Sequence, residues 1–63
     1  MKIICALTLE RETKGALRYQ EIDDQGQPLE TGRAKIGTLY IRKTAFEPGV
    51  MPPRIKVAIE AEK

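Results

Sequence analysis

The sequence contains no histidine, serine, asparagine or tryptophan, and it has a single cysteine. Without histidine and serine, the chain cannot build a serine–histidine or cysteine–histidine nucleophile. Paired carboxylates remain, as in glycoside hydrolases, but these need a cleft that shifts two pKa values apart, and 63 residues are too few to enclose one. No glycine-rich nucleotide-binding motif occurs either. We therefore expect a protein that is not an enzyme and has no small-molecule substrate.

The lone cysteine, Cys5, excludes an intramolecular disulfide, and without histidine it cannot complete a zinc site. Asp23 and Asp24 are adjacent, but they lack the alternating oxygen ligands of a calcium loop and are typical of a turn. We expect no metal and no cofactor. Cys5 lies between apolar residues, so we expect it to fill the core, and a single reduced thiol favours the cytoplasm.

Long apolar runs are also missing. The apolar stretch over residues 3–9 is interrupted by Thr8 and followed at once by Glu10. A membrane span needs about 20 apolar residues, and a signal peptide needs a longer apolar segment before its cleavage site. We expect neither.

The length of the chain predicts one domain over residues 1–63 with a thin core. Domains this small are usually reinforced by disulfides, a metal or self-association. The first two are excluded above. Self-association remains.

What the sequence does contain is alternation. In residues 36–43, Leu39 and Ile41 fall on one side and Tyr40 and Arg42 on the other, which indicates a half-buried strand with Gly37 inside it. Residues 54–62 alternate in the same way, with Ile55, Val57 and Ile59 on the apolar side. No segment shows a helical period over ten or more residues.

Two further strands are predicted at the start of the chain, over residues 3–9 and 16–22. The first is apolar on both faces, which favours a central position in the sheet. Thr13, Lys14 and Gly15 can close a three-residue hairpin, with Gly15 in the positive-φ conformation of a bulge. That register places Leu9 opposite Tyr19 and Glu10 opposite Arg18.

Together these strands predict an all-β fold without a substantial helix, either a four-stranded antiparallel meander or a small open barrel. A polar connection over residues 23–33 joins the second and third strands. Between the third and fourth strands, residues 44–47 match a capping box, but Pro48 and Gly49 limit any helix to one turn. This loop also carries Phe46, Val50 and Met51, which either cover the core or form a patch for a partner. We favour the core.

Charge is uneven along the chain. Residues 1–31 carry four basic and six acidic side chains, whereas residues 32–63 carry seven basic and three acidic ones. On the solvent side of the predicted sheet, cations surround one aromatic ring. This combination is typical of surfaces that bind single-stranded nucleic acid. The candidate residues are Arg18, Tyr40, Arg42, Arg54 and Lys56.

Two alternatives accompany that hypothesis. The same residues also suit an ordinary solubilising surface, or the protein can be an interaction or assembly subunit that binds no nucleic acid. A sheet with one apolar face and no helix to cover it further predicts a homodimer, with a closed monomeric barrel as the alternative. The sequence patterns identify no protein family.

Overall fold

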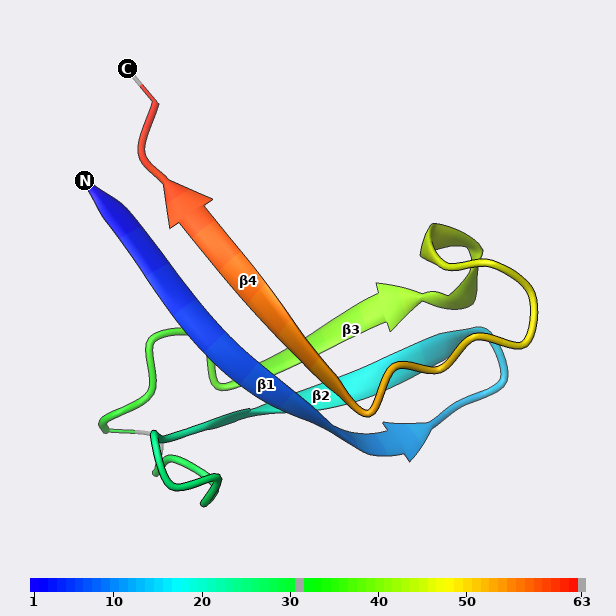
Figure 1. Cartoon of the computed structure of the whole chain (residues 1–63), viewed down its shortest axis with the longest axis horizontal. Coiled ribbons are helices and arrows are strands. Elements are labelled where there is room, and N and C mark those ends of the chain that lie inside the picture. Colours follow the sequence, from blue (N-terminus) through cyan, green and yellow to red (C-terminus); the bar gives the residue numbers. More distant parts are fainter. Residues whose placement is uncertain (31, 63) are drawn as a thin grey trace.

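The structure is a computed structural model of the chain, and it describes residues 1–30 and 32–62. Four strands form one sheet in the order β3-β2-β1-β4. Their bounds are β1 Lys2–Glu12, β2 Ala16–Ile22, β3 Thr38–Arg42 and β4 Arg54–Glu60. In Figure 1 the blue β1 and the orange β4 run side by side across β2 and β3.

All pairings are antiparallel, and the prediction of an all-β fold is confirmed. Of the two arrangements left open, the sheet is the curled one, a half-barrel whose edge strands are β3 and β4 (Figure 1). A meander would keep the strands in chain order. Here β4 returns to pair with β1, which is the order of a Greek key and makes β1 internal, as its two apolar faces predicted.

The core lies on one face of the sheet, which we call the inner face. Four buried side chains form its centre, and half-buried apolar side chains from β1, β3, β4 and the segments flanking β3 pack around them. The central residues are Cys5, Leu7, Leu17 and Tyr19. The alternation in the sequence predicted all four for this face, and Cys5 is core filler as expected, at 5% exposure.

A bulge in β1 changes the predicted hairpin register. Leu9 lies opposite Tyr19 as expected, but Arg11 and not Glu10 lies opposite Arg18. Glu10 is the extra residue of the bulge. Its carboxylate still forms an ion pair with Arg18, with Oε1 2.8 Å from Nε.

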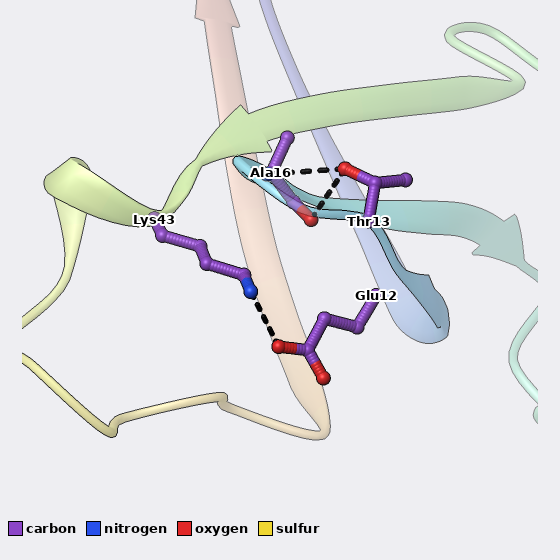
Figure 2. A network of polar contacts seen from close by, with 4 residues as sticks. All are labelled: Glu12, Thr13, Ala16 and Lys43. Atoms are coloured by element: carbon purple, nitrogen blue, oxygen red, sulfur yellow. Dashed lines mark hydrogen bonds and ion pairs between the residues drawn. The ribbon is translucent and has the colours of Figure 1, made fainter.

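The bulge also moves the residues after it to the other side of the strand. Glu12 therefore lies opposite the core residue Leu17, at the rim of the inner face. There its carboxylate pairs with the Lys43 ammonium, which joins the end of β1 to the segment after β3 (Figure 2).

The hairpin loop has the predicted three residues, but the positive φ expected at Gly15 was wrong. In the part of the chain that the structure describes, the glycines with positive φ are Gly26, Gly37 and Gly49. Thr13 closes the loop instead. Its backbone N–H donates to the Ala16 carbonyl at 2.8 Å. Its hydroxyl donates to the same carbonyl at 3.0 Å (Figure 2). This closure needs no left-handed residue.

Glu21 is a carboxylate on the inner face, and only 3% of it is exposed. Its Oε1 accepts the backbone N–H groups of Lys35, Ile36 and Gly37, at 2.9, 2.7 and 3.0 Å. Burial by itself raises the pKa of a carboxyl group, but the three N–H donors outweigh it and lower the pKa of Glu21.

This contact explains why β3 is shorter than predicted. The strand expected over residues 36–43 begins only at Thr38, because residues 35–37 turn their N–H groups onto Glu21. Gly37 precedes the strand with φ of 83°, so its expected place inside the strand was wrong. The fourth strand also ends earlier than expected, at Glu60.

The loop between β3 and β4 covers part of the core. It begins with one 3-10 turn, Lys43–Ala45, and Phe46 then packs against the core cluster. Further on, the buried Tyr19 donates its hydroxyl to the Pro52 carbonyl at 2.8 Å. Val50 and Met51 stay 45% and 46% exposed, so Phe46 alone of the three apolar loop residues covers the core as favoured.

The loop after β2 folds over the other face of the sheet. Asp23 accepts the N–H groups of Gln25 and Gln27, both at 2.9 Å, and this tight turn brings Gly26 beside the Arg54 side chain. Beneath it Ile22 is only 5% exposed, although it alternates away from the core.

No helix among the described residues is long and apolar enough to cross a membrane.

Candidate nucleic-acid interface

The five candidate residues all lie on the face opposite the core, which we call the outer face. Cross-strand register shows this, because residues directly opposite one another share a face. Tyr40 lies opposite Arg18, and Arg42 lies opposite Ala16. On β4, Arg54 lies opposite Thr8 and Lys56 opposite Ala6.

Tyr40 is the centre of one group. Its side chain is 55% exposed, and the Arg18 guanidinium carbon lies 5.7 Å from the ring centroid. That distance allows a cation–π interaction, which holds the ring in place. The Glu10 carboxylate holds Arg18 from the other side and offsets part of its charge.

A shallow groove of about 380 Å³ runs beside this ring. Tyr40 and Arg42 of β3 form one side of it, and Thr13, Gly15 and Ala16 of the hairpin form the other. Gly15 and Ala16 are small, which leaves the space open. The Thr13 hydroxyl is already engaged with Ala16, so Arg42 supplies the charge of the groove.

Arg54 and Lys56 belong to a second group at the opposite end of the outer face. They line a hollow of about 440 Å³ together with two cations that the sequence analysis did not select, Arg33 and Lys35. The only signal for Arg33 and Lys35 in the sequence is the basic excess of its second half. Their place beside β4 depends on the path of the loop.

Acidic side chains moderate the charge of this hollow. Asp23 and Asp24 line it, and Glu21, whose side chain lies on the inner face, borders it. Glu21 is held by three N–H groups, as described above. The N–H groups of Gln27 and Gln25 and the nearby charge of Arg33 lower the pKa of Asp23, which is therefore ionised at neutral pH.

The sheet thus separates the candidate residues into two groups. Arg18 and Arg54 lie two strands apart, on β2 and β4, which is roughly 10 Å at ordinary strand spacing. Arg54 ends a cross-strand row whose other members are neutral and polar: Thr8, Gln20 and Thr38. A ligand that contacts both groups has to extend over at least this distance.

In the described part of the chain, the Cys5 thiol and the acidic side chains form no comparable arrangement for nucleophilic or metal chemistry. Burial is the main reason that the pKa of the Cys5 thiol is raised, and the nearby Glu21 carboxylate raises it further. Within residues 1–30 and 32–62, no three histidine, cysteine, aspartate or glutamate side chains gather at a distance that could hold a metal ion.

Comparisons with models of protein families, with curated proteins and with solved structures found no match.

Proposed function

We propose that the protein binds single-stranded nucleic acid across its outer face. The observation that carries this proposal is the half-exposed ring of Tyr40, held by Arg18 beside a groove that also contains Arg42. An exposed aromatic ring stacks with a base of any identity, and flanking cations attract the phosphates.

The second group of cations extends this surface. A strand that stacks on Tyr40 and runs across the sheet passes the neutral polar row and reaches Arg54 and Lys56. In this proposal the protein is a non-enzymatic binding module. It has little sequence preference, because it stacks on bases and contacts phosphates but makes no hydrogen bonds to base edges. A cytoplasmic location belongs to the same proposal and is supported by the single buried thiol of Cys5.

Fluorescence anisotropy with labelled single-stranded and duplex oligonucleotides tests the proposal. We expect the single strand to bind at low salt and the affinity to fall steeply between low and moderate salt, because phosphate contacts release counterions. Absence of binding to the single strand at low salt would contradict the proposal. Equal binding to the duplex would contradict the stacking role of Tyr40.

The variant Tyr40→Ala isolates stacking. It should weaken binding by about 1–3 kcal/mol, the usual range for loss of one base–aromatic stack. The matched control is Tyr40→Phe, which keeps the ring and should bind within about twofold of the parent protein. Tyr40 is exposed, so both variants should keep the circular dichroism spectrum of the parent.

The variant Arg42→Ala isolates charge. It should reduce the slope of log affinity against log salt by about one unit, because one phosphate contact is lost. Lys43→Ala removes the same charge from the next residue, which points to Glu12 and away from the groove. That control should leave the slope unchanged.

The alternative function, a protein-interaction or assembly subunit, is favoured by the exposed apolar side chains Val50, Met51 and Ile59. Binding through such a surface responds little to salt, since it releases few counterions. The salt titration therefore separates the two functions.

A further inference from the structure

Among the residues that the structure describes, the backbone groups on the outer edge of β4 have no hydrogen-bond partner strand. β4 is an edge strand of the sheet: in the described part of the chain, β1 is its neighbour on one side and no strand lies on the other. Leu9 donates its N–H to the Pro53 carbonyl, and Ala61 donates its N–H to the Met1 carbonyl. Because antiparallel bonding alternates along a strand, the odd-numbered residues of β4 face β1 and the even-numbered residues face outward.

The outward residues are Arg54, Lys56, Ala58 and Glu60. Each presents one N–H and one C=O, and β4 contains no proline that would interrupt a further ladder. A seven-residue edge of this kind pairs readily with another strand.

The charge pattern of β4 is complementary to itself. When two copies of the strand run antiparallel about a two-fold axis at Val57, all seven residues find a partner. Arg54 then lies opposite Glu60 of the second copy, and Ile55 lies opposite Ile59. The positive end of each strand meets the negative end of the other, and the apolar residues of the inner face meet one another.

The exposure of these side chains agrees with such a pairing. Ile59 is 41% exposed although it lies on the inner face, and Ile55 and Val57 are only half-buried. Pairing two copies covers all three. The other edge strand, β3, has five residues. Antiparallel pairing of two copies of β3 about its centre would set Thr38 opposite Arg42, so no opposite charges would meet.

We propose that a second copy of this chain pairs with β4 in that register, so that two half-barrels share one continuous sheet. The interface is self-complementary and leaves no β4 edge for further copies, so it closes at the dimer. Arg54 and Lys56 belong to both proposed surfaces, but the pairing needs only the edge and side chains of β4, whereas the stacking residue Tyr40 lies on β3, at the far side of the sheet. The proposal therefore does not depend on nucleic-acid binding.

Charge reversal tests the proposal by sedimentation equilibrium. The parent chain should form dimers at micromolar concentration. Arg54→Glu and Glu60→Arg, measured separately, should each dissociate about tenfold more readily, because each sets like charges opposite one another at two symmetry-related positions. Both side chains are exposed, so circular dichroism should show an unchanged fold.

An equimolar mixture of Arg54→Glu and Glu60→Arg is the decisive sample. In the mixed dimer both charge pairs are again opposite, so the mixture should associate as tightly as the parent. A mixture no tighter than the separate variants would overturn the proposal, as would a parent chain of 7.1 kDa at every concentration.

Lys56→Glu is the matched control for register. Lys56 lies opposite Ala58 of the second copy, so this variant should change the dissociation constant by no more than about twofold. A register shifted by two residues would set Lys56 against Glu60. Strong weakening by Lys56→Glu would therefore contradict the proposed axis at Val57.

Cross-linking locates the axis without reference to charge. Val57→Cys places two thiols across the axis at a non-hydrogen-bonded pair, with Cα atoms about 4.5 Å apart, which suits a disulfide. The native Cys5 lies opposite Val57 in the same chain and must first be replaced by alanine. Ile55→Cys in that background should not cross-link to itself, and equal cross-linking of the two variants would overturn the proposed register.

Discussion

Glu21 carries a charge inside the core of a small sheet and compensates it with three backbone N–H groups. These bonds organise the turn before β3, which is also joined to β2 by the Glu21 backbone N–H donating to the Gly37 carbonyl at 2.8 Å. The carboxylate therefore acts as a structural anion that accepts the N–H groups of residues 35–37.

We predict that Glu21→Gln lowers the free energy of unfolding by about 1–3 kcal/mol, since charge-assisted bonds to a buried group are replaced by weaker neutral ones. Urea denaturation followed by circular dichroism measures this. Glu47→Gln, at an exposed loop position, is the control and should have almost no effect. Equal effects of the two variants would show that the three N–H bonds do not stabilise the fold.

The lowered pKa of Glu21 predicts how this contribution depends on pH. A carboxyl group with a lower pKa in the folded state stabilises the fold fully above its unfolded-state pKa, whose ordinary value is 4.5. The contribution is lost as the pH falls from there through the folded-state pKa. The stability difference between the parent and Glu21→Gln should therefore be constant between about pH 5 and about pH 7. It should shrink below about pH 4.5. A difference that grows on acidification would contradict the assigned role.

At the scale of elements, the loop after β2 produces a small second apolar centre on the outer face. Ile4 and Ile22 both lie on that face, but Ile22 is 5% exposed and Ile4 is 56% exposed. The loop pairs with Ile22 through a bridge to Pro28, whereas Ile4 has no such bridge among the described residues, and alternation within the strands does not reveal this difference.

We predict that Ile22→Ala lowers the free energy of unfolding by about 2–4 kcal/mol, because it opens a cavity under the loop. Ile4→Ala removes the same atoms from a mostly exposed site and should cost less than about 1 kcal/mol. Chemical denaturation of both variants decides this. Similar losses would mean that the loop does not cover Ile22.

At the scale of the whole molecule, the half-barrel has a thin core and two open edges. Four side chains form its buried centre, and Ile59, Val50 and Met51 remain exposed. Pairing through β4 adds apolar contacts that one copy lacks, which is the contribution that domains of this length usually need.

Coupling between folding and association should appear in thermal unfolding. We predict that Tm of the parent chain rises by several degrees for each tenfold increase in protein concentration, because mass action favours the associated folded state. Differential scanning calorimetry over a hundredfold range of concentration measures this, and Glu60→Arg should show a smaller dependence. A Tm independent of concentration would contradict a dimer that stabilises the fold.

The alternation of apolar residues alone determined that there are four strands, which face is the inner one, and that all five candidate residues lie on the outer face, because side chains on neighbouring positions of a strand point to opposite sides. The internal position of β1 also follows from its sequence, since both of its faces are apolar. These are local properties of consecutive residues.

Contacts between distant segments decided the rest. Glu21 shortened β3 by binding the N–H groups of residues 35–37, and the bulge at Glu10 moved Glu12 to the inner rim, where it meets Lys43. The loop path brought Arg33 and Lys35 beside Arg54 and Lys56 and buried Ile22. Each outcome depends on where a backbone group or a charge finds its partner in space. Only the folded chain determines that, because the partners are far apart in the sequence.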